Sequence, residues 1–289
     1  MRVLITGADG QLGRALHAMA PNGWNITAVR RAELDVTDRT AAAAAVARLR
    51  PELVINAAAY NLVDKAETKS RRAFAVNADG PANLAAAARI HGARFFHVST
   101  DYVFDGRKST PYQPDDPATP LNTYGRSKLE GETRAHEESA GQALIVRTAW
   151  VYAAHGHNFV KTILHLNAER DSLRVVCDQI STPTWASTLA QVLWAAAARP
   201  ALRGIYHWTD AGVASWYDLA VAIQEEALTL GLIAGAIPIH PIPTADYPLP
   251  AARPAYSVLD KSKTLADLGL EGLHWRTALR QMLAELKHA

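Results

Sequence analysis

A short apolar strand that runs directly into a turn with regularly spaced glycines opens this chain. Residues 3–6 are largely apolar, and Gly7, Gly10 and Gly13 follow, with a helix-compatible stretch behind them. Glycine lets the backbone turn tightly and approach a ligand closely, and the N-terminus of a helix attracts anions. The order strand, glycine turn, helix therefore predicts a parallel α/β sheet whose first turn holds the pyrophosphate of a dinucleotide.

The first half of the chain continues this alternation of apolar runs and helix-compatible stretches. Strands are expected at residues 3–6, 24–29, 53–58, 94–99 and 143–148, and helices at residues 11–20, 39–49, 65–90 and 125–139. Because parallel strands are joined by right-handed helical crossovers, the pattern predicts an α/β fold with a Rossmann-type doubly wound sheet. Ligands of such sheets bind at the carboxyl ends of the strands.

The alternation weakens in the second half, where prolines cluster at residues 238–243 and 247–254 and predict ordered loops. We therefore assign residues 1–152 to a dinucleotide-binding domain and residues 153–289 to a smaller, discontinuous C-terminal substrate-binding lobe. Two segments of the region 173–200 are candidates to return to the first sheet: residues 173–178 and the helix expected at 185–198.

Composition narrows the possible partners and the compartment. Thirty Lys and Arg against 28 Asp and Glu leave a formal net charge of +2, without a basic run of the kind that binds nucleic acid. The single cysteine, Cys177, cannot form an internal disulfide, and no Cys/His cluster predicts a metal. Apolar stretches fall well short of the roughly 20 residues that span a bilayer. We expect a cytoplasmic protein without nucleic-acid or membrane partners.

The glycine spacing is GxxGxxG, which resembles the extended short-chain dehydrogenase/reductase superfamily and differs from the GxGxxG of ordinary dehydrogenases. Gln11 and Leu12 lie inside this turn, so we include them among the cofactor-binding residues. The alternative is that the three glycines serve only the packing of strand against helix.

The next two strand ends favour NADPH, with NADH possible. An NAD-binding protein places an acid on the ribose about 20 residues past the glycine turn, but this chain has Arg30 and Arg31, which suit a 2'-phosphate. The alternative is that both arginines are solvated surface charges. Two further sets complete the expected cofactor site: Asp35 and Val36, which resemble the superfamily's adenine-binding segment, and Ala57, Ala58 and Ala59, whose small side chains leave room for the cofactor.

Thr100, Tyr124 and Lys128 are the expected catalytic residues. Tyr124 and Lys128 stand four positions apart, so on a helix both project from one face. A free tyrosine has a pKa of about 10, and we expect the Lys128 cation to lower it. Thr100 would donate a hydrogen bond to a substrate carbonyl, which Tyr124 would protonate while a reduced nicotinamide delivers hydride. The alternative is that Tyr124 and Lys128 lie on the solvated surface of a helix and have no role in catalysis.

Five sequence blocks resemble the dTDP-4-dehydrorhamnose reductase family, in that family's order: NAAAYNLVDKAE (56–67), STDYVF (99–104), PLNTYG (120–125), RTAWVY (147–152) and PLPAARP (248–254). The resemblance implies reduction at C4 of dTDP-4-dehydro-L-rhamnose to dTDP-L-rhamnose, a nucleotide sugar for bacterial cell-surface polysaccharide. It also implies that Thr100, Tyr124 and Lys128 match the family's catalytic threonine, tyrosine and lysine.

The same resemblance implies four substrate-binding residues: Trp150, Asn158, Gln179 and Arg253. Trp150 matches a tryptophan that packs against the sugar, although a tryptophan at a strand end is as often part of a core. Arg253 suits a diphosphate because a guanidinium fork matches phosphate oxygens; the alternative is a surface ion pair.

One departure from the family concerns magnesium. Some members form a dimer that shares this ion through two glutamates, and at those places this chain has Ala15 and Ser187, which are poor magnesium ligands. We therefore predict no metal and do not carry over that dimer, although a homodimer of another kind is possible.

A nucleotide-sugar dehydratase would share the fold, the glycine turn and the Tyr/Lys pair. A dehydratase needs Asp-Glu after the threonine, but Asp101 and Tyr102 follow it here; a GDP-fucose synthase would carry a cysteine in that loop, far from Cys177. Another nucleotide-sugar reductase or an epimerase stays open, as does a non-catalytic, NADP-binding regulatory subunit like the one that modulates methionine adenosyltransferase.

Overall fold

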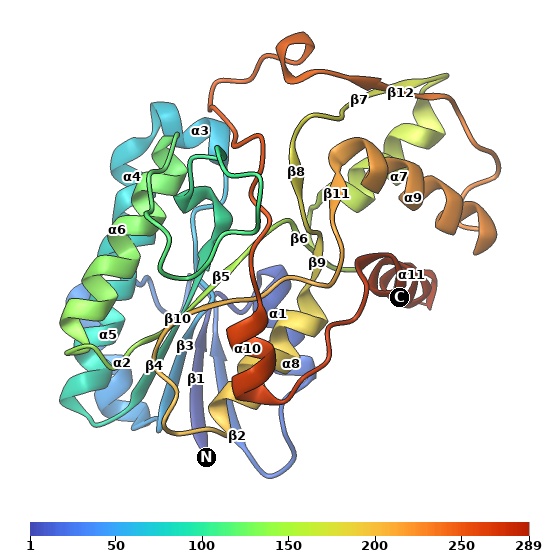
Figure 1. Ribbon diagram of the computed structural model, residues 1–289. Coiled ribbons are helices and arrows are strands. Elements are labelled where there is room, and N and C mark those ends of the chain that lie inside the picture. Colours follow the sequence, from blue (N-terminus) through green and yellow to red (C-terminus); the bar gives the residue numbers. More distant parts are fainter. Residues whose placement is uncertain (289) are drawn as a thin grey trace.

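A six-stranded parallel sheet forms the centre of the computed structural model, which describes residues 1–288 (Figure 1). The strand order is β10-β5-β4-β3-β1-β2. Because the chain steps outward from β1 in both directions, the carboxyl ends of β1 and β3 flank the switch point where such sheets bind ligands. The predicted doubly wound α/β fold is confirmed. Its strands are β1 (Arg2–Thr6), β2 (Asn25–Val29), β3 (Leu53–Asn56), β4 (Arg94–Thr100), β5 (Leu144–Thr148) and β10 (Gly204–His207).

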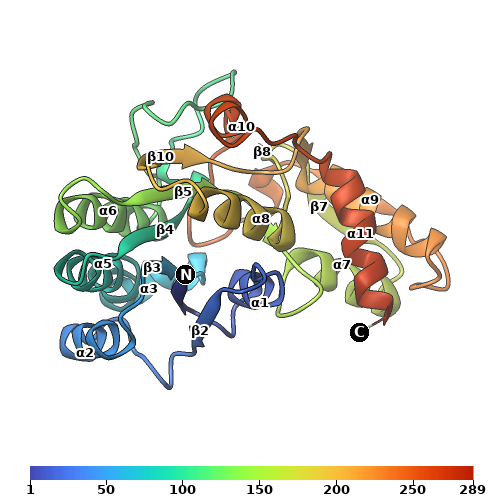
Figure 2. The same cartoon turned by 90° about the horizontal axis from the view of Figure 1, so that it is seen from below.

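Helices cover both faces of this sheet, as Figure 2 shows. Val3 and Ile5 pack toward one helical layer, whereas Leu4 between them packs toward the other. The alternation follows from the opposite directions of successive side chains on a strand, and it explains why the strands are apolar throughout. One layer holds α1 (Gln11–Ala18) and α8 (Ala186–Ala197), and the other holds α2 (Arg39–Leu49), α5 (Gly80–Ile90) and α6 (Thr123–Glu138).

The helix expected at residues 65–90 is interrupted. Asn77 lies in a π-helical turn, accepts a hydrogen bond from the Tyr60 amide at 2.8 Å and donates to Ser127 Oγ at 3.0 Å. A Cβ on Gly131 of α6 would lie 1.9 Å from the Asn77 carbonyl oxygen, so α6 presses directly against this turn. Close tertiary contact thus divides the segment into α3 (Val63–Thr68), α4 (Ser70–Phe74), η1 (Ala75–Asp79) and α5.

The second half forms a smaller lobe and also contributes to the main sheet. The helix expected at 185–198 does return to that sheet as α8, and β10 extends it, which the sequence did not predict. The expectation for residues 173–178 was wrong, because β7 (Leu173–Val176) pairs with β12 (Ile239–Ile242) outside the main sheet. β12 also lies in the expected proline loop 238–243; Pro241 is tolerated because a two-stranded sheet consists only of edge strands.

The lobe's short strands pair in parallel, except for antiparallel β8 with β11. The pairs are β6 (Val151–Tyr152) with β9 (Thr184–Trp185), β7 (Leu173–Val176) with β12 (Ile239–Ile242), and β8 (Ile180–Ser181) with β11 (Ala214–Ser215). The remaining elements are α7 (Phe159–Glu169), α9 (Trp216–Thr229), α10 (Ser262–Leu268), α11 (Trp275–His288) and the short 3-10 turns η2 (Asp101–Val103) and η3 (Thr244–Asp246).

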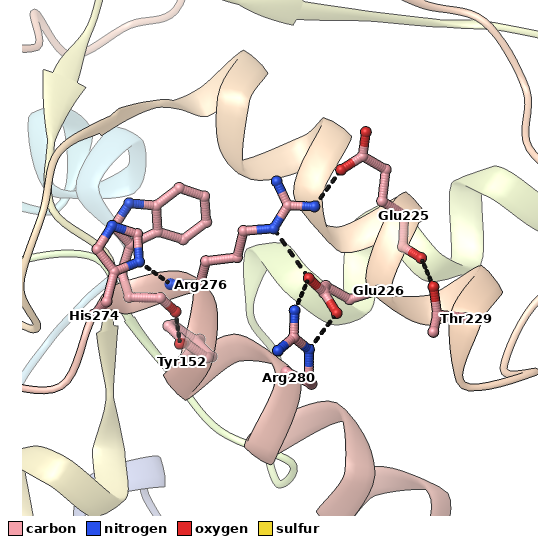
Figure 3. Close-up of polar contacts among 8 residues, drawn as sticks. Tyr152, Glu225, Glu226, Thr229, His274, Arg276 and Arg280 are labelled. Atoms are coloured by element: carbon pink, nitrogen blue, oxygen red, sulfur yellow. Dashed lines mark hydrogen bonds and ion pairs between the residues drawn. The ribbon is translucent and has the colours of Figure 1, made fainter.

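Two arginines of α11 form ion pairs with a glutamate of α9 (Figure 3). The Glu226 carboxylate accepts hydrogen bonds from Arg280 at 2.7 and 2.8 Å and from Arg276 at 3.0 Å. The Glu226 side chain is 5% exposed, whereas the side chains of Arg276 and Arg280 are 42% and 57% exposed, so two partly solvated cations compensate a buried carboxylate. We retain residue 152 as a proposed domain boundary. Within residues 1–288, no helix combines the length and apolar character needed to cross a bilayer.

Candidate active site

A cavity of about 300 Å³ lies at the carboxyl ends of the central strands. Its walls come from the glycine turn, the ends of β3 and β4, the first turns of α6 and the segment after β5. Nine residues expected from the sequence line it: Gly10, Gln11, Leu12, Ala57, Ala59, Thr100, Tyr124, Lys128 and Trp150.

Close contacts with neighbouring backbone exclude a side chain at Gly7 and at Gly13 of the glycine turn. Gly7 has φ +74°, and a Cβ there would lie 2.7 Å from the Ala57 carbonyl carbon. A Cβ on Gly13 would lie 2.2 Å from the Gly7 oxygen. Gly10 is the N-cap of α1 and has no side chain, which leaves the first N–H groups of the helix for a ligand. The turn therefore fits a dinucleotide pyrophosphate, by the close approach that only glycine permits.

The start of α6 places Tyr124 beside the end of β4. Asn122 caps the helix by accepting from the Gly125 amide at 2.7 Å. A Cβ on Gly125 would lie 2.1 Å from the Tyr102 carbonyl oxygen, so the helix rests directly on the turn that follows Thr100. The two side chains that the sequence separates by 24 positions therefore line one cavity.

Lys128 follows one helical turn later and is 1% exposed. Its ammonium donates to the Val98 carbonyl at 2.6 Å and lies 3.4 Å from His97 Nε2. Burial lowers the pKa of Lys128 to about 8, and the nearby Glu132 charge opposes that shift. Lys128 is thus a buried cation that can lose its proton near neutral pH.

The pKa of Tyr124 is raised, whereas we expected the Lys128 cation to lower it. Burial raises the pKa of Tyr124 to about 12, while a hydrogen bond with Thr100 acts in the opposite direction. The physical reason is that desolvation disfavours phenolate, and the Lys128 ammonium is directed to the Val98 carbonyl. A phenol in this state stays protonated at neutral pH and is suited to donate a proton.

The comparisons with known proteins agree with this geometry. A family model described as RmlD substrate binding domain matches residues 1–288. The dTDP-4-dehydrorhamnose reductase of Aggregatibacter actinomycetemcomitans is 42% identical over 290 residues, which cover 98% of each chain. The chain belongs to the dTDP-4-dehydrorhamnose reductase (RmlD) family. The family resemblance of the sequence motifs is thereby confirmed.

Solved structures of RmlD family members superpose on the whole chain. A dTDP-4-dehydrorhamnose reductase from Clostridium acetobutylicum has a TM-score of 0.93 at 38% identity and covers 99% of this chain and 100% of its own. The Bacillus anthracis enzyme, solved in complex with NADP, has a TM-score of 0.93 at 35% identity, with coverages of 98% and 99%. The RmlD fold therefore extends over both the sheet and the C-terminal lobe.

The remaining residues of the expected cofactor site lie around the ends of β2 and β3. Ala58 follows β3, and its amide donates to Asn56 Oδ1 at 3.2 Å. Val36 is buried, and Asp35 accepts hydrogen bonds from the amide and the hydroxyl of Thr37. Arg30 and Arg31 directly follow β2 at the same edge of the sheet as the glycine turn. Both guanidinium groups are largely exposed and pair with Glu33 and Asp35.

Replacing Arg30 and Arg31 together with alanine should weaken NADPH binding at least about tenfold more than NADH binding, because only NADPH carries the 2'-phosphate. The measurement is the dissociation constant of each cofactor by fluorescence titration. Arg48→Ala, which removes an exposed arginine near the end of α2, is the matched control and should change neither constant. If the double variant lost the same affinity for NADPH and for NADH, the two arginines would act only by general electrostatic attraction and not by contact with the 2'-phosphate.

The four expected substrate residues have separate surroundings. Trp150 has φ +46°, and its indole stacks on Trp216 with ring centroids 3.5 Å apart. Gln179 accepts from Trp216 Nε1 at 3.1 Å. Asn158 does not line the cavities that hold the other three; it caps α7 and donates to Gln11 Oε1 at 2.9 Å. Asn158 therefore contacts the glycine turn through Gln11, and its role in substrate binding stays a prediction.

A second, mostly apolar cavity of about 280 Å³ lies in the lobe and is bordered by Gln179, Arg253 and Trp216. Trp216 also lines the first cavity, so its indole stands between the two. Arg253 forms an ion pair with Asp64 at 2.8 Å, and its side chain is only 15% exposed, so this is not a pair at the surface; diphosphate binding by Arg253 stays a prediction. The sequence missed Trp216 because its only local signal is the capping box of Ser215 and Asp218 that starts α9.

The positions that lack the family's glutamates lie together in space. Ala15 and Ser187 both line a surface hollow of about 540 Å³ beside the glycine turn. Across the part of the chain that the structure describes, no three His, Cys, Asp or Glu side chains form a group that could hold a metal.

Extensive dialysis against EDTA should leave turnover and oligomeric mass unchanged, because alanine and serine stand where carboxylates would be needed to bind magnesium. Turnover is followed by NADPH absorbance and mass by light scattering, with a mock-dialysed sample as the control. Loss of activity that magnesium alone restores would contradict this prediction.

Proposed function

We propose that this protein is a dTDP-4-dehydrorhamnose reductase that uses NADPH, with NADH possible, to reduce the C4 carbonyl of dTDP-4-dehydro-L-rhamnose to dTDP-L-rhamnose. The observation that carries the proposal is that Thr100, Tyr124 and Lys128 line one cavity together with the glycine turn. Full-length relatives at about 40% identity bear this enzyme name, and one solved relative was crystallised with NADP. The product would supply the nucleotide sugar for a cell-surface polysaccharide.

Each of the three candidate catalytic residues would have a separate role in carbonyl reduction. When bound, the reduced nicotinamide supplies the hydride. Tyr124, held protonated by burial, delivers a proton to the carbonyl oxygen, and Thr100 hydrogen-bonds the same oxygen. Lys128 would supply a buried positive charge at the same cavity and could hydrogen-bond a ribose of the cofactor. These groups would stabilise charge as it develops on the oxygen.

The cofactor and the substrate would enter from different sides of the cavity. Gly7, Gly10 and Gly13 with the N-terminus of α1 would hold the pyrophosphate of NADPH. We place the nucleotide of the substrate in the lobe cavity, whose apolar walls suit a base, with Arg253 near its diphosphate. The indole of Trp150 would then contact the sugar between the two cavities.

The deciding experiment measures NADPH oxidation by the purified protein with and without enzymatically generated 4-keto sugar nucleotide. We expect oxidation only when the keto sugar is present, and dTDP-L-rhamnose as the product by mass spectrometry and NMR. Stoichiometric NADP binding without turnover would favour a regulatory subunit. A product that is an isomer of the substrate, formed without net NADPH oxidation, would favour an epimerase.

A further inference from the structure

The carboxyl group of Asp101 lies directly behind the hydroxyl of Thr100. Asp101 is 2% exposed and begins the turn η2. Its Oδ1 is 3.1 Å from Thr100 Oγ1, and its Oδ2 accepts from Ser257 Oγ at 2.6 Å. Ser257 belongs to the segment that also carries Arg253, far along the chain. Two distant parts of the fold thus enclose a carboxyl group at the back of the active site.

A count of hydrogens shows why the state of this carboxyl matters. Thr100 Oγ1 carries one proton, it accepts from the Tyr102 amide at 3.2 Å, and it also hydrogen-bonds the Tyr124 phenol. An ionised Asp101 can only accept hydrogen bonds, so Thr100 must donate its single hydroxyl proton to Asp101 Oδ1. The hydroxyl would present a lone pair to the substrate, whose carbonyl oxygen is itself an acceptor.

A protonated carboxyl reverses this hydrogen bond. The acid O–H donates to Thr100 Oγ1, and the threonine proton becomes free to turn toward the cavity. Ser257 can still donate to Oδ2 in this state.

We propose that Asp101 is a positioning residue that acts in its protonated form: its O–H donates to Thr100 Oγ1 and directs the threonine proton to the substrate carbonyl oxygen. The proposal rests on the proposed reduction of a carbonyl in this cavity. It assigns no new chemical step, because the acid proton stays on Asp101 throughout. It explains why a carboxyl is enclosed by hydroxyl groups with no cation beside it among residues 1–288.

The surroundings of Asp101 allow the protonated state. Burial raises the pKa of Asp101 to about 6, and hydrogen bonds from Ser257, Thr100, its own amide and Ser181 act in the opposite direction. The titratable groups that face it are the phenols of Tyr102 on its own turn and Tyr124 on α6. Burial raises the pKa of both phenols, so both are neutral.

The nearby charges are engaged elsewhere. Lys128 donates to the Val98 carbonyl, and Arg253 pairs with Asp64. The carboxyl therefore changes its protonation near its raised pKa of about 6.

Asp101→Asn tests the proposal, because the amide Nδ2 always donates to Thr100 while the amide oxygen can accept from Ser257. We expect the variant to keep turnover within several-fold of the native enzyme at about pH 5.5. Native kcat should fall as pH rises through the pKa of Asp101, whereas the variant should hold its kcat until Lys128 deprotonates. The ratio of variant to native kcat should rise about tenfold or more between about pH 5.5 and pH 8, with the KM for NADPH unchanged.

Two further variants separate this role from a structural one. Ser257→Ala removes a donor that stabilises the carboxylate, so the fall in kcat should begin at a higher pH. Asp115→Asn removes an exposed carboxylate and should leave the pH profile unchanged. A folded Asp101→Asn protein that loses about 100-fold in kcat at every pH would overturn the proposal, since an ionised carboxylate would then be required.

A measurement without turnover keeps this proposal distinct from the proposed function. The carboxyl carbon of Asp101 is followed by NMR in aspartate-labelled protein with NADP bound, and it is assigned by its absence in Asp101→Asn. We expect a titration midpoint well above that of an exposed aspartate, and a still higher midpoint in Ser257→Ala. A midpoint in the ordinary aspartate range would overturn the role of Asp101. Absence of keto-sugar reduction by the native protein would instead contradict the proposed function.

Discussion

Tyr124→Phe should lower turnover by at least about 100-fold while leaving NADPH binding nearly intact. Phenylalanine keeps the ring, and with it the edge-to-face contact with Tyr102 at 5.7 Å between centroids. The substitution removes only the hydroxyl that we propose delivers the proton. The measurement combines steady-state kcat with a fluorescence titration of NADPH.

The matched control is Tyr102→Phe, which removes a phenolic hydroxyl from the same cavity. We expect this variant to stay within several-fold of native turnover, because its hydroxyl has no role in the proposed proton transfer. Near-native turnover in Tyr124→Phe would remove Tyr124 from the mechanism. Comparable losses in both variants would mean that the polarity of the cavity, and not one proton donor, supports the reaction.

Glu132→Gln should lower the free energy of unfolding by about 3–5 kcal/mol. Glu132 on α6 pairs with Arg147 on β5 through contacts of 2.7, 3.0 and 3.2 Å, and both side chains are less than 5% exposed. A guanidinium cannot lose its proton, so the substitution leaves Arg147 as a buried charge without a counterion. The measurement is urea-induced unfolding followed by circular dichroism.

Glu130→Gln is the control on the same helix. Glu130 pairs with Arg134, but both side chains are 41% exposed, and ion pairs at the surface contribute about 1 kcal/mol or less. A loss of under about 1 kcal/mol in Glu132→Gln would show that the buried pair is not a net support of the fold. The contrast between the two variants isolates the effect of burial, because the chemistry of the substitution is the same.

Local patterns in the sequence predicted much of the main sheet. Five of its six strands and the helices at 11–20, 39–49 and 125–139 were placed within a few residues, because each follows from apolar runs and glycine positions that neighbours along the chain determine. The catalytic and cofactor residues were nominated in the same way. Tyr124 and Lys128 fall one helical turn apart on α6, and Gly7 lies where the backbone of Ala57 leaves no room for a side chain.

Contacts between distant residues, in contrast, were decided only by the tertiary structure. β10 joins β5, and β7 pairs with β12, because short strands pair where the sheet or lobe offers an open edge, which a local pattern does not encode. The pKa of Tyr124 rises because burial outweighs the opposing hydrogen bond with Thr100, and burial depends on the whole fold.

The same holds for the polar contacts around the active site. Arg253 meets Asp64 across 189 positions, and Ser257 meets Asp101 across 156. The sequence by itself determined which chemistry the chain carries, because turns, strands and helix spacing are local properties. The tertiary structure decided which charges and hydroxyls surround that chemistry, because desolvation and hydrogen bonding depend on groups that packing alone brings together.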